Sequence, residues 1–136
     1  MSERSTRLSE TEKITINLGP VDLGRIDLLV EQGLYTNRTD LIRTAIRNQL
    51  DRHEPIVQEA VVTRSATIGV LVLGRKELEA RKVSGERMKL FLVGMLVLTN
   101  DVTPELALNA IESITVYGVF RAPAAVREAL GDRIRR

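Results

Sequence analysis

The N-terminal third of the chain changes its hydrophobic period as it proceeds. Residues 13–18 alternate strictly, with apolar side chains at positions 14, 16 and 18, which predicts a half-buried strand. A glycine-proline pair ends this pattern, and the apolar residues of 21–32 then fall on one face of a helix that Gly33 terminates. A second amphipathic helix follows, with Asn37 as N-cap and Asp40 completing an imperfect capping box, and it ends before residue 55. The pattern predicts one strand followed by two helices.

A lone strand in so small a unit needs a partner. Its backbone groups would remain unpaired on both edges, and about 40 residues bury too little apolar surface to be stable alone. Two copies of the chain could pair their strands as an antiparallel ribbon, with four helices packed beneath it. The alternative is that this strand joins a sheet formed by later strands of the same chain.

The C-terminal half contains a weak internal repeat. An apolar-Gly-apolar-apolar core recurs in residues 67–71, 92–96 and 116–120, with its glycines at positions 69, 94 and 118. A helix-prone segment follows each core, at residues 76–83, 104–111 and 123–130. This spacing predicts about three strand-helix units, arranged as a short solenoid or as a layered α/β module, in which the glycines allow close approach of neighbouring strands. The alternative is a plain three-stranded α/β domain whose glycines align by chance. The apolar run 90–98 is typical of a central strand covered on both faces.

The N-terminal unit resembles a known family of DNA-binding proteins. The resemblance is carried by KITINLGPVDLGRIDLLVEQGLYTNRTDLIRTAIRNQL, and it covers roughly residues 12–52. Its elements are the alternating strand, the Gly-Pro entry to the first helix, Gly33-x-Tyr35, and the opening of the second helix from Asn37 to Arg43. Together and in this order they resemble the ribbon-helix-helix family, the MetJ, Arc and CopG class. The resemblance implies an obligate dimer whose two-stranded ribbon lies in the DNA major groove.

Candidate DNA contacts follow from the alternation and from the resemblance. If the apolar side chains of the strand pack on the helices, Lys13, Thr15 and Asn17 project from the opposite face of the ribbon. Lysine suits guanine O6 and N7, asparagine suits adenine, and threonine offers a hydroxyl and a methyl group. The alternative is that the three are ordinary solvent-facing residues. The family also binds phosphate through the backbone N–H groups that open the second helix, which here are those of Asn37, Arg38 and Thr39.

Composition narrows the range of functions. The chain has no cysteine, and His53 is its one histidine, which argues against thiolate or multi-histidine metal sites and against a catalytic triad. We therefore expect no cofactor, no metal and no enzymatic activity. The net charge is only +2, and residues 1–54 carry eight Lys or Arg against nine Asp or Glu, so a DNA surface must come from local placement of charge. The charged N-terminus and the absence of an apolar run of about 18–20 residues predict a cytoplasmic, nucleoid-associated protein without a membrane span.

These patterns predict an α+β chain with four parts. They are a flexible arm (1–12), a ribbon-helix-helix DNA-binding domain (13–52), a linker (53–64) and an oligomerisation or effector module (65–136). The expected function is a sequence-specific transcriptional regulator, a repressor or autoregulator. It would bind double-stranded DNA as a homodimer through the N-terminal strand, with higher association through the C-terminal half. Two alternatives remain open, namely a self-assembling scaffold protein anchored to DNA and an antitoxin-type regulator.

Overall fold

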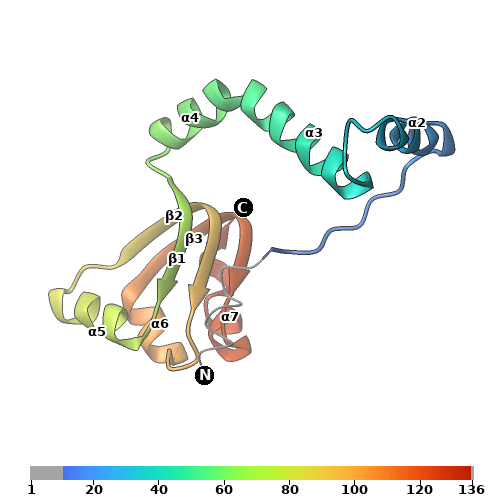
Figure 1. Cartoon of the computed structure of the whole chain (residues 1–136). Coiled ribbons are helices and arrows are strands. Elements are labelled where there is room, and N and C mark those ends of the chain that lie inside the picture. The colour runs from blue at the N-terminus through green and yellow to red at the C-terminus, as the bar shows by residue number, and fades with distance from the viewer. Residues whose placement is uncertain (1–10, 136) are drawn as a thin grey trace. The chain divides into compact units, whose positions relative to one another are not determined.

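The chain is divided into two units by its internal contacts. The computed structural model describes residues 11–135, so the first ten residues of the predicted arm lie outside the described part. One unit ends at Glu59 and the other begins at Ala60. Figure 1 shows the helices of the first unit and the sheet and helices of the second.

The two helices predicted in the N-terminal unit are confirmed. Helix α2 (Pro20–Glu31) begins with a proline at its first position, where a missing N–H does no harm. It ends at Glu31, and Gly33, two residues later, has a φ of 84° in the left-handed region. The Leu34 N–H then donates to the Leu29 carbonyl at 3.1 Å, which satisfies a carbonyl at the helix end. Helix α3 (Arg38–Arg52) follows after a short turn.

The strand predicted at residues 13–18 is not present in the single chain. Residues 11–19 form neither helix nor strand, and in the described residues no other segment pairs with them. A strand exists only where a neighbour accepts and donates its backbone hydrogen bonds. The alternative prediction, that this segment joins the sheet of the C-terminal half, is wrong for the single chain, because that sheet is formed by other residues.

The segment predicted as a linker, residues 53–64, is largely helical. Helix α4 (Glu54–Thr63) begins one residue before Pro55, so the proline falls in the first turn, where its missing N–H has no helical acceptor to lose. The division between the two units falls inside this helix, between residues 59 and 60.

The C-terminal unit is a parallel sheet built in chain order. Its strands are β1 (Thr67–Leu73), β2 (Met88–Leu98), β3 (Ile111–Arg121) and β4 (Ile134–Arg135), and each pairs with the next in parallel. The connections contain α5 (Arg75–Ser84), α6 (Pro104–Ala110), α7 (Ala124–Ala129) and the short 3₁₀ helix η1 (Gly131–Arg133). The three predicted strand-helix units are all present. The fourth strand was not predicted, because two residues give no period to read.

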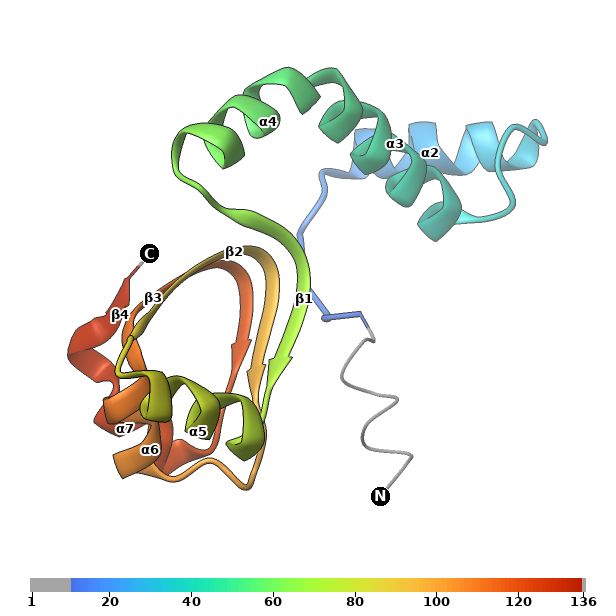
Figure 2. The same cartoon turned by 90° about the vertical axis from the view of Figure 1, so that its left-hand side faces the viewer.

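The core of this unit lies on one face of the sheet. Figure 2 shows the long strands bent together, with α5, α6 and α7 on the concave side. Alternate residues of the strands, including Leu92, Leu96 and Ile114, join buried residues of the helices, such as Leu78 and Val126, in one apolar cluster. Strand β2 lies between β1 and β3, as the apolar run 90–98 predicted, and Met95 and Val97 on its other face are also buried.

The three repeat glycines lie side by side across the sheet. Gly69 pairs with Gly94, and Gly94 pairs with Gly118. Their φ values are 143°, 144° and 128°, a conformation that other residues rarely adopt. A Cβ on Gly94 would collide with the carbonyl oxygen of Gly69, and one on Gly118 would collide with that of Gly94. The close approach of neighbouring strands predicted from the repeat is therefore confirmed.

Candidate nucleic-acid interface

The residues predicted to contact base edges lie in the segment before α2. Lys13, Thr15 and Asn17 are all exposed, in a stretch without helix or strand. The apolar residues between them are exposed as well, with Ile14 at 75% and Ile16 at 60% of full accessibility. The predicted burial of these residues on the helices is therefore absent in the single chain.

The helices of this unit also lack a buried side. In α2 and α3 no residue is buried, although both helices are amphipathic. Large apolar side chains remain exposed on both helices, among them Leu28, Ile46 and Leu50. Since burial of apolar surface is the main driving force of folding, this unit needs a further partner surface to be stable.

The residues predicted to contact phosphate are brought together in the first turn of α3. The Asn37 side chain accepts a hydrogen bond from the Asp40 N–H at 2.8 Å, which confirms the predicted N-cap. The Asp40 carboxylate accepts from the Thr36 N–H at 2.9 Å, one residue earlier than the capping box predicts. Across residues 11–135, the backbone N–H groups of Asn37, Arg38 and Thr39 donate to no acceptor, so they remain free for an anion.

Arg38 is held by an acidic residue that the sequence did not single out. Its Nε donates to one Asp27 carboxylate oxygen at 2.7 Å, and its second terminal nitrogen donates to the other at 2.8 Å. This two-pronged pair joins α2 to the start of α3, and both side chains are about half exposed. The hydrogen bond from Arg38 lowers the pKa of Asp27 below its ordinary value, and Asp27 raises that of Arg38. No periodic signal predicts this contact, because the two residues lie 11 positions apart on different helices.

The sequence of most of the chain is matched by a family model. The model of the ribbon-helix-helix transcriptional regulator family matches residues 9–127, which is most of the chain. The chain belongs to this family. It is therefore a transcriptional regulator, and the match extends well beyond the N-terminal third that carried the resemblance in the sequence. The C-terminal half, which resembled no family by its motifs, is included in the family model.

A curated relative agrees with this assignment. The ribbon-helix-helix regulator is similar to "Transcriptional regulator CdrS" of Halobacterium salinarum, with 31% identity over 42 residues. The match spans 31% of this chain and 76% of the relative. No solved structure matches the chain.

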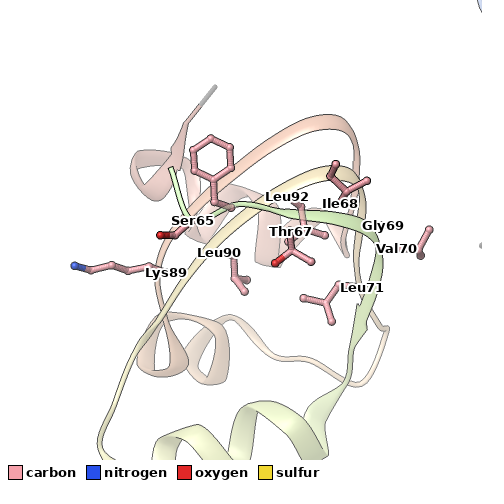
Figure 3. A pocket seen from close by; sticks show the side chains of 10 residues that line it. Ser65, Thr67, Ile68, Gly69, Val70, Leu71, Lys89, Leu90 and Leu92 are labelled. Carbon is pink, nitrogen blue, oxygen red and sulfur yellow. The ribbon is translucent and has the colours of Figure 1, made fainter. Parts of the chain in front are cut away.

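The described residues offer no metal site and no membrane-spanning helix, but they do form a hollow on the C-terminal sheet. Among residues 11–135, no three His, Cys, Asp or Glu side chains gather in a way that could hold a metal ion. In the same part of the chain, no helix has the length and apolarity needed to cross a membrane. A hollow of about 260 Å³ lies along β1 and β2, where Thr67, Leu71 and Leu90 line its inner side (Figure 3).

Proposed function

We propose that this ribbon-helix-helix regulator is a sequence-specific DNA-binding protein that acts as a repressor or autoregulator. Residues 13–18 of two copies pair as an antiparallel ribbon that enters the major groove. The observation that carries the proposal is the exposure of the apolar side chains at 14, 16 and 18, in strict alternation with polar ones. A second copy would cover the apolar set and would leave the polar set facing the groove.

Base reading is assigned to the polar set. Lys13 would donate to guanine O6 or N7, and Asn17 would form a bidentate pair with adenine. Thr15 would offer its hydroxyl to a base edge or its methyl group to thymine. The short side chains of Thr15 and Asn17 would hold the ribbon close to the floor of the groove. The side chain of Lys13 is longer and more flexible.

Phosphate binding is assigned to the start of α3. The free N–H groups of Asn37, Arg38 and Thr39 supply the main contact, assisted by the positive end of the helix. The Arg38 side chain adds less charge than an unpaired arginine would, because Asp27 neutralises it. Its pairing with Asp27 instead fixes where α3 begins relative to α2, and thereby where the three donors point.

The C-terminal unit is proposed to serve oligomerisation or effector binding. It has a buried core of its own, whereas the tail of an antitoxin is typically disordered until it binds. Neither catalysis nor a resident cofactor is part of the proposal. Repression follows from occupancy, since a ribbon in the major groove excludes other proteins from that site, and the protein would act at the nucleoid.

Selection of bound sites from random duplex DNA tests the proposal. The full chain should enrich a short, two-fold symmetric sequence, because the ribbon of a homodimer is itself symmetric. Binding of all duplexes alike would instead favour the scaffold alternative, in which DNA serves only as an anchor.

Substitution of Asn17 separates base reading from general affinity. Asn17→Ala should relax the preference at one base position, by about 1–3 kcal/mol for a bidentate contact. Thr11→Ala is the matched control, because Thr11 is exposed but precedes the alternating segment. If Asn17→Ala and the wild-type protein select the same DNA sequences, Asn17 does not read a base.

The ion pair provides a second discriminating comparison. Arg38→Ala should weaken binding to all sequences and lower its salt dependence. Asp27→Asn keeps the arginine but removes its charged partner. If the charge of Arg38 matters most, Asp27→Asn should bind as well as the wild type or more tightly. If the position of α3 matters most, Asp27→Asn and Arg38→Ala should weaken binding to a similar degree.

A further inference from the structure

The two ends of the C-terminal sheet are finished differently. Beyond β3, strand β4 pairs with Ile114 and Thr115. Further along the same edge, the Arg127 guanidinium donates to the Phe120 carbonyl at 2.8 Å and lies over the Phe120 ring. The edge of β3 is therefore partly paired and partly occupied by a charged side chain. These are devices by which proteins keep an edge strand from pairing with another chain.

The opposite edge, at β1, has no such device. In the described residues β1 pairs only with β2. Its sequence, TIGVLVL, contains no charged residue and no proline. Ile68, Val70 and Val72 on its outer face are exposed, Val70 at 56% of full accessibility. The outer face near β3 differs, because Arg64 donates to the Tyr117 hydroxyl at 3.0 Å and lies over the Phe91 ring.

The glycine row ends in an open position at this edge. A Cβ atom on Gly94 or on Gly118 would collide with the glycine carbonyl of the preceding strand. Gly69 has the same type of backbone, with φ 143°, but nothing lies within 4 Å of the corresponding position. The place that a neighbouring strand's backbone occupies next to the other two glycines is therefore empty next to Gly69.

Both faces of β1 are apolar at this edge. Leu71 and Leu73 pack in or against the apolar cluster of the unit, whereas Ile68 and Val70, at alternate positions, are exposed. Ile68, Val70 and Leu71 all belong to the lining of the hollow along β1 and β2 (Figure 3). A strand added to the edge would therefore cover apolar side chains on both faces and would pair the free backbone groups of β1.

We propose that the occupant is β1 of a second copy of this chain, paired antiparallel about a two-fold axis near Val70. A two-fold axis places like residues opposite one another, which requires an uncharged strand, and β1 carries no charge. Only residues 64–66 separate β1 from α4. In the sequence, this edge strand therefore comes shortly after the unit that is proposed to dimerise through its ribbon. The pairing joins two four-stranded sheets into one continuous sheet of eight strands. It rests on the proposed oligomerising role of the C-terminal unit and gives that role a specific surface.

The test compares four full-length chains by sedimentation. Ile16→Lys places a charge beneath the proposed ribbon and blocks pairing there, and Val70→Lys brings two like charges together at the β1 edge. Each single variant should remain at least dimeric through the other interface, and the double variant should have the mass of a monomer. Val83→Lys in the Ile16→Lys background is the matched control, because Val83 is 88% exposed on α5, and this chain should stay dimeric.

The outcomes separate the two interfaces. A monomeric Ile16→Lys chain that retains the circular dichroism of its sheet would overturn pairing at β1 and leave the ribbon intact as a proposal. A monomeric Val70→Lys chain together with a dimeric Ile16→Lys chain would instead overturn the ribbon and support pairing at β1.

A cross-link provides a second measurement that does not depend on the lysine variants. The natural chain has no cysteine, so Val70→Cys introduces a single thiol. Opposed residues of antiparallel strands have Cα atoms about 4.5–5.5 Å apart, within the range of a disulfide. Mild oxidation should link most Val70→Cys chains into covalent dimers but few Val83→Cys chains. Equal linking of both variants would overturn the proposed register.

Discussion

The two units of this regulator use similar apolar patterns but differ in what those patterns bury. Between Leu73 and Leu130, sixteen apolar side chains are buried in the C-terminal unit. Between residues 11 and 59, no side chain is buried, although the strand-like segment and both helices are amphipathic. A periodic apolar face therefore predicts that its residues will be covered, but it does not predict whether the same chain or a second one covers them.

The difference has a topological cause. Parallel strands need long connections, and the C-terminal unit supplies them through α5, α6 and α7, so that its four strands pair with one another within one chain. The N-terminal unit has one strand-like segment and no second one with which to pair. In the proposed homodimer, a second copy would supply the missing strand by symmetry.

The largest expected effect comes from Ile16→Lys. The charge should prevent association of the N-terminal units, because it would have to be buried beneath the ribbon, and DNA binding should be lost. The sheet of the C-terminal unit should remain folded, since its core lies in the same chain. Circular dichroism and DNA titration of the variant check both expectations. Retained DNA affinity in this variant would contradict the dependence of residues 11–59 on a second copy.

Gly94→Ala should act on the other unit. The added methyl group meets the Gly69 carbonyl, and the left-handed φ of 144° adds strain of about 1–3 kcal/mol. Gly69→Ala carries the strain alone, because its position is open in the single chain. In the Val70→Lys background, where β1 should stay unpaired, thermal unfolding should therefore show a larger loss for Gly94→Ala than for Gly69→Ala. A loss confined to DNA binding, with unchanged unfolding of the sheet, would contradict the separation of the two units.

Sequence patterns predicted most elements of both units. The predicted caps at Gly33 and Asn37 are confirmed, the first by its left-handed φ of 84° and the second by the hydrogen bond that its side chain accepts from the Asp40 N–H. These features depend on neighbours within a few residues, so local sequence carries them. The repeat spacing also predicted the alignment of Gly69, Gly94 and Gly118.

Other features depend on contacts that no local pattern encodes. The Asp27–Arg38 pair joins two helices, and β4 is too short to show a period. The second helix ends before Pro55, as predicted, but the segment predicted as a linker is largely helix α4, in which Pro55 lies in the first turn. The strand predicted at residues 13–18 is not formed in the single chain. In the proposed dimer it would form by pairing with a second chain, and the sequence indicates this need only by an alternating segment that has no partner strand in its own unit.

The smallest expected effect concerns acid stability. The hydrogen bond from Arg38 lowers the pKa of Asp27 in the folded chain, so its stabilising contribution is present above the ordinary aspartate pKa and is lost as the pH falls through the lowered value. Both side chains are about half exposed, which keeps the contribution small. Asp27→Asn should therefore lower the stability slightly near neutral pH and make no difference at a pH below the lowered pKa, so that the acid dependence of unfolding becomes shallower. A steeper acid dependence in the variant would contradict the assignment.

The central claim is that residues 13–18 become an ordered strand only by pairing with a second copy. Hydrogen exchange of the full-length protein, followed by mass spectrometry of the peptides that cover this segment, tests it most directly. We expect strong protection of these amides in the associated protein and rapid exchange in the Ile16→Lys variant, with the peptides of β2 and β3 protected in both. Exchange of residues 13–18 in the associated wild-type protein at the rate of an unstructured peptide would contradict the account.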